Sequence, residues 1–253
     1  MALYAYETDQ LTKSLRRRLR LGADPSLAAR VQSGQARLFL ACRNGQTVGA
    51  AFSENGKELT ALTGEPAARA LLQTVGNRAL GLPPAPDAPE LWDMRDETGE
   101  VTGRITSRDQ YKKLQSGEYA LVVHIYLFTP DGRCLIQKRS ETKAVLPGVW
   151  DITGGSAMLG EDGLTAALRE TREEVGLVLE PGQLVREATL LRRRSFLEIW
   201  SATLPIDPSR CVLEPSEVEA VRLVSREELC RIIQTARYRD RAYKACVLSI
   251  LKK

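Results

Sequence analysis

The sequence predicts an α/β fold with α+β character: a small α+β domain, followed by an α/β/α sandwich over a mixed sheet. Three observations lead to this prediction. A proline-rich segment divides the 253-residue chain, the basic surplus lies before it, and strand patterns alternate with helical ones after it. The chain is 43% hydrophobic and 27% charged, values typical of globular proteins, so disordered and fibrous classes are excluded.

Residues 1–82 are expected to form helices around a three-stranded meander. Leucines recur every four residues from Leu11 to Leu19, and Asn-Gly pairs at 44–45 and 55–56 predict tight turns between strands. The arrangement resembles the middle of an N-acetyltransferase fold, but no R/Q-x-x-G-x-G/A loop for coenzyme A is present. An accessory or dimerisation domain is therefore the favoured interpretation.

The segment GLPPAPDAPE, residues 81–90, contains four of the twelve prolines and is expected to be extended. Residues 1–82 carry 11 basic and 6 acidic side chains, whereas the remainder carries 25 basic and 26 acidic ones. We therefore expect a basic accessory domain at 1–82, a linker at 83–90 and a larger domain at 91–253.

The larger domain is expected to begin with two extended segments around a turn at 97–100. A hairpin follows, LVVHIYLF and CLIQKRS, with its turn at 129–132. A helix is predicted at about 162–176, then a strand in SFLEIWSATL. The residues from 225 to 228 form a capping-box start for another helix, and the segment from 240 to 253 is also expected to be helical.

Composition also limits the location and the partners of the chain. No window approaches the run of about 18 apolar residues that a membrane helix needs, and no secretory signal is legible. Five scattered cysteines without a C-x-x-C pair favour a reduced, cytoplasmic protein. The basic run at 16–20 has no interleaved aromatic residues, so we interpret it as a solvated helix face and expect no nucleic-acid partner. A homo-oligomer remains open.

A single histidine, His124, excludes metal sites that need several imidazoles from one chain. It lies in an apolar strand pattern, which favours a core histidine over a catalytic one. A Ser-His-Asp triad would have to use His124, and no G-x-S-x-G motif accompanies it.

Three glutamates on the helix at about 162–176 indicate phosphate chemistry. Glu170, Glu173 and Glu174 have i, i+3, i+4 spacing and therefore share one helix face, where their charges repel. A divalent cation removes this repulsion, and carboxylate oxygens are ligands suited to Mg²⁺ together with substrate phosphates. The spacing predicts a Mg²⁺ site, with a solvated acidic face as the alternative.

The surrounding residues favour the metal site. The segment resembles the complete Nudix box, G-x5-E-x7-R-E-U-x-E-E-x-G-U, with a chance of coincidence below about one in 10⁸ per starting position. Its matching residues are Gly155, Glu161, Arg169, Glu170, Glu173, Glu174 and Gly176. Thr171 stands where an aliphatic residue is usual. The resemblance covers about residues 90–235. The order of the segments LWDMRDETGEVTGR, LVVHIYLFTPDGRCLIQKRSETK and PGVWDITGGS is similar to that in the isopentenyl-diphosphate-isomerase-like branch of the Nudix superfamily.

The resemblance implies a Nudix α/β/α sandwich that binds Mg²⁺ or Mn²⁺. It also implies that water attacks phosphorus in a small-molecule substrate, a nucleoside diphosphate linked to some moiety X. The implied metal ligands are Glu170, Glu173, Glu174 and the Gly154 carbonyl. Arg169 would orient the glutamates through a salt bridge, for which its i, i+4 spacing to Glu173 is suitable.

Further residues have two interpretations each. Glu198 is a candidate general base or extra ligand, or else an outward-facing strand residue. Glu161 is favoured at a helix start by the dipole, or it lies near the metal. Arg139 and Lys143 match positions where this branch contacts the substrate diphosphate, and ordinary surface charge is the alternative. Trp150 packs in the core or stacks on a base.

The branch also raises isomerisation of isopentenyl diphosphate as an alternative activity. The isomerases of this family use a cysteine and several histidines, whereas residues 150–156 contain neither residue type. Hydrolysis is therefore favoured. A non-catalytic Nudix ligand-binding module is the remaining alternative, but such modules usually have a degraded box, and this box is intact.

Overall fold

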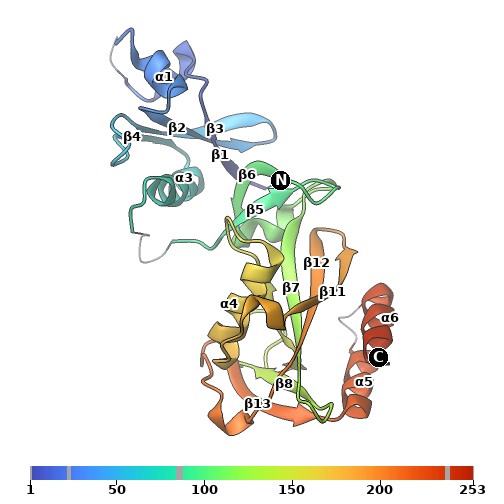
Figure 1. The fold of residues 1–253 in the computed structure, drawn as a ribbon. Helices are drawn as coiled ribbons and strands as arrows, with labels where there is room; N and C mark the ends of the chain where they lie inside the picture. Colours follow the sequence, from blue (N-terminus) through green and yellow to red (C-terminus); the bar gives the residue numbers. More distant parts are fainter. Residues whose placement is uncertain (1, 22–23, 84–87, 237–239, 253) are drawn as a thin grey trace. The chain divides into compact units, whose positions relative to one another are not determined.

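The structure is a computed structural model that describes residues 2–21, 24–83, 88–236 and 240–252 (Figure 1). The chain divides into two compact units. The first comprises Met1–Ala120 and Met158–Gly160, and the second comprises Leu121–Ala157 and Glu161–Lys253. None of the helices in the described ranges is both long enough and apolar enough to cross a membrane.

The first unit contains a six-stranded sheet in the order β4-β3-β2-β1-β6-β5, and its paired strands are antiparallel. The strands are β1 Tyr4–Thr8, β2 Arg37–Arg43, β3 Gln46–Ser53, β4 Ala61–Gly64, β5 Leu91–Arg95 and β6 Val101–Ser107. The helices are α1 Lys13–Arg18, α2 Leu27–Gln32, α3 Pro66–Ala79 and the 3₁₀ helix η1 Arg108–Lys113. One apolar cluster joins α3 to the sheet, and a second joins α1 and α2 to it.

This sheet continues past the proline-rich segment. Strands β5 and β6 follow residues 83–90, and β6 pairs with β1 so that Ala5 lies opposite Ile105. The compact units therefore divide after Ala120 rather than at 83–90, because strands from both sides of that segment share one sheet. Of the expected linker, residues 84–87 lie outside the described residues.

This sheet order leads to a prediction for fragments of the chain. A fragment that starts at Ala88 is expected to aggregate more than one that starts at Glu118. The longer fragment retains β5 and β6 but lacks β1, so it exposes the edge of β6 and uncovers Met94, which is 1% exposed beside Ala2 and Tyr4. Size-exclusion chromatography with light scattering at equal concentrations checks this. A monomeric Ala88 fragment with an equal melting temperature would contradict it.

The second unit contains a sheet in the order β11-β12-β7-β8-β13, with β10 paired to β7 and β9 to β8. Its strands are β7 Ala120–Phe128, β8 Cys134–Arg139, β9 Trp150–Asp151, β10 Thr153–Ser156, β11 Val185–Leu191, β12 Ser195–Thr203 and β13 Val218–Val224. Its helices are α4 Gly163–Val175, α5 Arg226–Thr235, α6 Arg241–Ile250 and the 3₁₀ helices η2 Pro181–Gln183 and η3 Pro208–Arg210.

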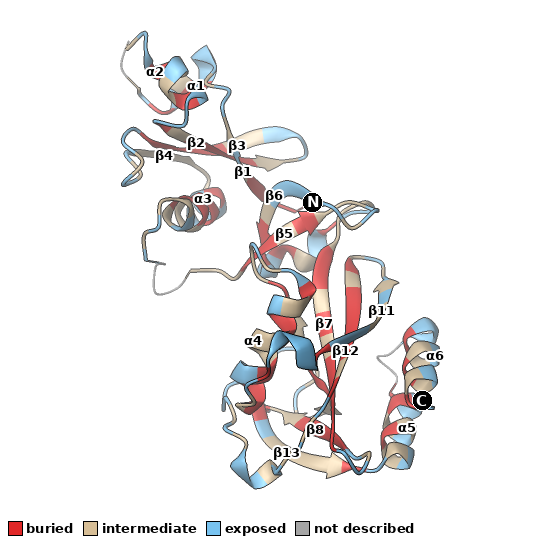
Figure 2. Cartoon of the chain, viewed as in Figure 1, coloured by how far each residue is buried: buried red, intermediate tan, exposed pale blue. Residues whose placement is uncertain are grey.

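Helices cover both faces of this second sheet. Side chains alternate along β7, so Val123 and Ile125 join the apolar cluster of α4, while Tyr126 and Phe128 join that of α5 and α6. Buried residues run along β7, β8 and β12 between these layers (Figure 2). The α/β/α sandwich expected from the sequence is thereby confirmed.

Helix α4 begins and ends at residues that local chemistry requires. Asp162 caps the first turn, since its carboxylate accepts the backbone N–H of Thr165 at 2.8 Å. Gly176 ends the helix in the left-handed conformation, at φ 72°. Thr171 lies on the buried face, where its hydroxyl donates to the Ala167 carbonyl at 2.8 Å. The polar side chain at this usually aliphatic position is therefore satisfied within the helix.

Candidate active site

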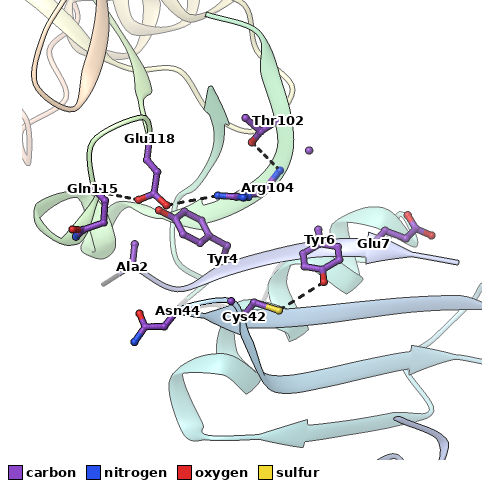
Figure 3. Close-up of a pocket in the computed structure, with 12 residues that line it drawn as sticks. Ala2, Tyr4, Tyr6, Glu7, Cys42, Asn44, Thr102, Arg104, Gln115 and Glu118 are labelled. Carbon is purple, nitrogen blue, oxygen red and sulfur yellow. Dashed lines mark hydrogen bonds and ion pairs between the residues drawn. The ribbon is translucent and has the colours of Figure 1, made fainter. Parts of the chain in front are cut away.

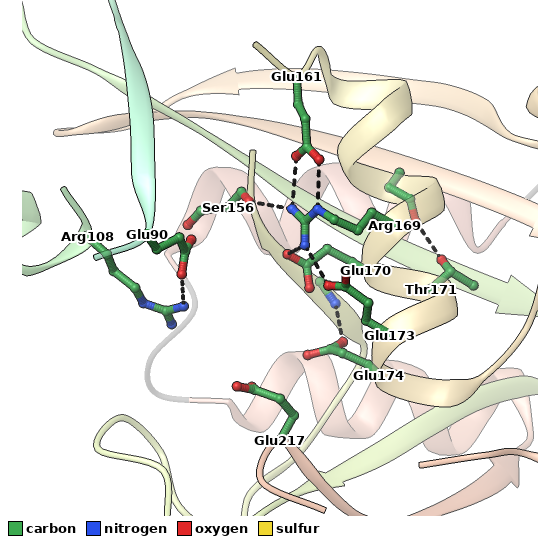
Figure 4. Close-up of polar contacts among 12 residues, drawn as sticks. Glu90, Arg108, Ser156, Glu161, Arg169, Glu170, Thr171, Glu173, Glu174 and Glu217 are labelled. Carbon is green, nitrogen blue, oxygen red and sulfur yellow. Dashed lines mark hydrogen bonds and ion pairs between the residues drawn. The ribbon is translucent and has the colours of Figure 1, made fainter. Parts of the chain in front are cut away.

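Arg169 gathers the carboxylates around α4 (Figure 4). Its Nε and Nη2 donate to the two carboxylate oxygens of Glu161, at 2.8 and 3.0 Å. Its Nη1 donates to Glu170 at 2.9 Å and to Glu173 at 3.0 Å. Nη2 also donates to the Ser156 carbonyl at 2.9 Å. One side chain thus fixes the loop before α4, two glutamates of α4 and the end of β10 relative to one another.

The charge balance of this group is negative. Burial lowers the pKa of Arg169, but the hydrogen bonds and charges of Glu161, Glu170 and Glu173 outweigh burial and raise that pKa above its ordinary value. The guanidinium therefore stays cationic. A single cation faces three carboxylates, so the group retains an excess of negative charge.

Glu174 is a buried carboxylate, 4% exposed, beside this group. Its Oε2 accepts from Gln137 Nε2 at 2.9 Å and from the Gly154 N–H at 3.0 Å. The pKa of Glu174 is raised to about 8, mainly by burial and further by the charges of Glu170 and Glu217, against the lowering effect of the two hydrogen bonds. Such an uncompensated buried carboxylate is typical of functional sites.

Alternate residues of β10 turn their backbone polar groups towards α4. Gly154 donates its N–H to Glu174, and the Ser156 carbonyl accepts from Arg169. The N–H and C=O of one strand residue point to the same side, so the Gly154 carbonyl lies on the edge that faces the glutamates of α4.

The two glycines of β10 predict different effects of alanine. A Cβ at Gly154 would lie 2.4 Å from the Val123 carbonyl oxygen, so β7 or β10 must shift, and we expect a loss of about 1–3 kcal/mol in the free energy of unfolding. A Cβ at Gly155 would lie 2.2 Å from Glu170 Oε1, the end of a side chain that can rotate only by giving up its 2.9 Å bond to Arg169. Gly155→Ala should therefore displace this carboxylate and lower turnover, at a smaller cost in stability than a shift of the backbone.

Urea denaturation and steady-state kinetics on both variants separate these effects. A Gly155→Ala protein with the turnover of the parent, or a Gly154→Ala protein with the stability of the parent, would contradict the assignment.

The oxygen donors here suit a divalent cation, although they do not converge on one point. Within the described residues, no three His, Cys, Asp or Glu side chains form a metal-binding arrangement. Arg169 holds Glu170 and Glu173, while Glu174 faces β8 and β10. All three are hard ligands on one helix, and the charge at Glu170 and Glu174 is what a cation would neutralise.

Two polar residues that the sequence analysis did not select lie beside Glu174. Gln137, on β8, is 1% exposed, donates to Glu174 and accepts from the Thr153 hydroxyl at 3.1 Å. An amide inside an apolar strand was the signal that could have identified it. The charge of Glu217 raises the pKa of Glu174, and Glu217 pairs with Lys143. Nothing in the sequence around Glu217 indicated that it would lie near Glu174.

Glu198 lies near the N-terminal end of α4, away from the three glutamates of that helix. It accepts from Arg186 Nη1 at 3.2 Å and from Trp200 Nε1 at 3.0 Å. A Cβ at Gly163, the first residue of α4, would lie 1.7 Å from its Oε2. Among the contacts of the described residues, none joins Glu198 to the three glutamates further along the helix.

The two predicted substrate-binding residues differ in position. Lys143 lies beside the carboxylates through its ion pair with Glu217. Arg139 instead donates from Nε to the Val145 carbonyl at 3.2 Å, and so packs on the loop that follows β8.

His124 and Trp150 lie on the face covered by α5 and α6. His124 Nδ1 is 3.1 Å from the hydroxyl of Tyr243, a residue of α6. The indole of Trp150 packs against the apolar cluster of this face, and the Arg222 guanidinium lies 4.8 Å from its ring centroid. Both positions agree with packing roles.

Comparison with known proteins gives one consistent result. The family model of the NUDIX domain matches residues 118–246. An uncharacterised Nudix hydrolase of Listeria monocytogenes is 36% identical over 141 residues, which cover 55% of this chain and 82% of that protein. Nudix hydrolase 3 of Arabidopsis thaliana is 30% identical over 155 residues, or 56% of this chain and 20% of that protein.

A similar fold occurs in the crystal structure of DR0079 from Deinococcus radiodurans. The TM-score is 0.51 at 23% identity, with 63% of this chain and 98% of that chain covered.

Proposed function

Because the chain belongs to the Nudix hydrolase family, and so acts on phosphoric anhydride bonds, we propose that it is a Mg²⁺-dependent pyrophosphohydrolase of a nucleoside diphosphate-X or a related compound. The observation that carries this proposal is the group of glutamates that Arg169 gathers on α4 against the glycines of β10. Mg²⁺ favours a few carboxylates together with substrate phosphates.

In this proposal, Glu170, Glu173, Glu174 and the Gly154 carbonyl hold Mg²⁺ or Mn²⁺. When bound, the cation neutralises phosphate charge and activates water. Arg169 orients Glu170 and Glu173, while Gln137 and the Gly154 N–H fix Glu174.

Glu173 is the candidate proton acceptor, because its side chain is 46% exposed and can reach water. Glu198 remains the alternative base. Its position beside Gly163 requires the substrate to extend to the first turn of α4.

Lys143 is proposed to contact the substrate diphosphate, since Glu217 holds its ammonium beside the group that contains Glu174. An approaching phosphate would compete with Glu217 for this cation. Arg139 is proposed to do the same after leaving the Val145 carbonyl.

Within the family we place the chain in the isopentenyl-diphosphate-isomerase-like branch, on the order of its segments. We do not propose isomerase activity, because residues 150–156 contain neither the cysteine nor the histidines of those enzymes. We propose a cytoplasmic location, since the five cysteines, all in the described part of the chain, are free thiols.

A screen of diphosphate compounds tests this function. Nucleoside triphosphates, nucleotide sugars, dinucleotides, and isoprenoid and thiamine diphosphates are incubated with Mg²⁺ while release of phosphate or pyrophosphate is measured. At least one compound should be hydrolysed, and a chelator should stop the reaction. No release from any compound, release that persists with the chelator, or enzymatic conversion of isopentenyl to dimethylallyl diphosphate would contradict the proposal.

A further inference from the structure

The cavity of about 610 Å³ in the first unit is lined by polar groups that bond to one another (Figure 3). Burial and a hydrogen bond to the Glu118 carboxylate raise the pKa of Tyr4 above its ordinary value. Glu118 also pairs with Arg104 at 3.7 Å, and the Cys42 thiol donates to the Tyr6 hydroxyl at 3.8 Å. A buried carboxylate whose hydrogen bonds all end on one oxygen lies in the second unit, on α4.

This carboxylate is that of Glu174. Gln137 Nε2, at 2.9 Å, and the Gly154 N–H, at 3.0 Å, both donate to its Oε2. Among the contacts of the described residues, no hydrogen bond or ion pair ends on the Oε1 of Glu174. The two donors therefore fix the side chain through Oε2 and leave Oε1 as the oxygen available to a cation.

The orientation of the Gln137 amide decides whether Glu174 meets a donor or an acceptor. The NH₂ group of the amide faces Glu174, so its carbonyl oxygen faces Thr153, whose hydroxyl donates to it at 3.1 Å. The reversed amide would place its carbonyl oxygen against the carboxylate, where two acceptors repel. The hydroxyl of Thr153 thus stabilises the amide orientation that presents a donor to Glu174.

Burial makes this orientation hard to replace. Gln137 is 1% exposed and Thr153 is 2% exposed, so water does not readily substitute for either bond. The chain of bonds also joins three elements, since Thr153 lies on β10, Gln137 on β8 and Glu174 on α4. Partners of this kind orient the ligands of metal sites, and their loss typically weakens metal binding by roughly 10- to 100-fold.

We propose that Thr153 is a positioning residue of the metal site on α4. Its hydroxyl orients the Gln137 amide, and the amide holds Glu174 by Oε2 so that Oε1 is directed to the cation. This inference rests on the proposed function, because it requires Glu174 to be a ligand of a divalent cation.

Mn²⁺ titrations of the full chain at pH 8, followed by electron paramagnetic resonance, test the proposal with two substitutions. Thr153→Val keeps the shape of the side chain but removes the hydroxyl, so the dissociation constant of Mn²⁺ should rise by about tenfold. Thr153→Ser keeps the hydroxyl, and its dissociation constant should stay within about twofold of that of the parent. A role in packing alone predicts the opposite order, because valine fills the space that serine leaves open.

Gln137→Met supplies a second test, since methionine is a flexible side chain without an amide. The dissociation constant of Mn²⁺ should again rise by about tenfold. In this background Thr153→Val should add less than about a further twofold, because Thr153 acts through Gln137. Fully additive effects of the two substitutions would overturn the proposal.

Thr171→Val is the matched control. Thr171 is also buried and lies on α4, but its hydroxyl donates to the Ala167 carbonyl. This variant should bind Mn²⁺ as the parent does, and a loss equal to that of Thr153→Val would overturn the proposal.

Comparison with Glu174→Gln separates this inference from the proposed function. If the parent binds Mn²⁺ and Glu174→Gln binds it more weakly, equal affinities of the parent and Thr153→Val would overturn this inference alone. A parent that does not bind Mn²⁺ would overturn the proposed metal site, and this inference with it.

Discussion

Replacing Glu174 by Gln is expected to lower kcat for the best diphosphate substrate by on the order of 10²–10⁴, or roughly 3–5 kcal/mol in the barrier. The substitution keeps the size of the side chain and an oxygen that can accept from Gln137 or from the Gly154 N–H, but it removes the charge. Steady-state hydrolysis with saturating Mg²⁺ measures the effect.

Glu180→Gln is the matched control, because Glu180 is exposed and lies beyond α4 at the start of η2. Its turnover should stay near that of the parent. A Glu174→Gln protein that hydrolyses as fast as the parent would mean that α4 does not hold the catalytic group.

The same substitution should stabilise the metal-free protein, and more so as the pH rises. The pKa of Glu174 is raised to about 8, so ionisation of this carboxylate opposes folding. The resulting loss is absent below the unfolded pKa, near 4.5, and complete above about pH 8. Gln does not ionise, so the advantage of the variant should grow from under about 1 kcal/mol at pH 5 to roughly 3–5 kcal/mol at pH 8.5.

Thermal unfolding of both proteins in a chelator, across this pH range, measures the difference. A constant difference in melting temperature between pH 5 and pH 8.5 would contradict the burial of an unpaired charge.

Arg169→Met is expected to lower the free energy of unfolding by about 3–5 kcal/mol. The substitution leaves Glu161 and Glu170, whose side chains are 15% and 13% exposed, without their cation, and it deprives the Ser156 carbonyl of its donor. The free energy of unfolding of Arg169→Lys should lie between those of the parent and of Arg169→Met, since an ammonium keeps the charge but cannot donate to both carboxylate oxygens of Glu161 as the guanidinium does.

Arg172→Met is the control on the same helix, because Arg172 is exposed. It should change stability by only a few tenths of a kcal/mol, through the charge near the end of the helix. Urea denaturation without metal compares the three variants with the parent. If the free energy of unfolding of Arg169→Met lies within about 0.5 kcal/mol of that of the parent, the ion pairs of Arg169 contribute no more than exposed surface pairs do, which would contradict this prediction.

Helix α4 could be predicted because its signals are local. Asp162 and Gly176 mark its ends, and the spacing of Glu170, Glu173 and Glu174 places these residues on one side. The alternation of strand and helix patterns after the proline-rich segment similarly predicted a sheet with helices on both faces, as its two apolar clusters show.

The boundary between the units could not be predicted in this way. The pairing of Ala5 with Ile105 joins residues 100 positions apart, whereas a proline-rich segment indicates only that the chain is locally extended. Long-range packing also decides the surroundings of Glu198, whose carboxylate lies against Gly163, and of Glu217, which lies beside Glu174. Neither contact leaves a pattern in the neighbouring sequence.

A titration with Mn²⁺, followed by electron paramagnetic resonance at pH 8 without substrate, tests most directly whether the glutamates of α4 hold a divalent cation. The parent should bind Mn²⁺, Mg²⁺ should compete for the same site, and both Glu170→Gln and Glu174→Gln should bind at least about tenfold more weakly. Equal Mn²⁺ affinity in the parent and in both variants would contradict a metal site on this helix.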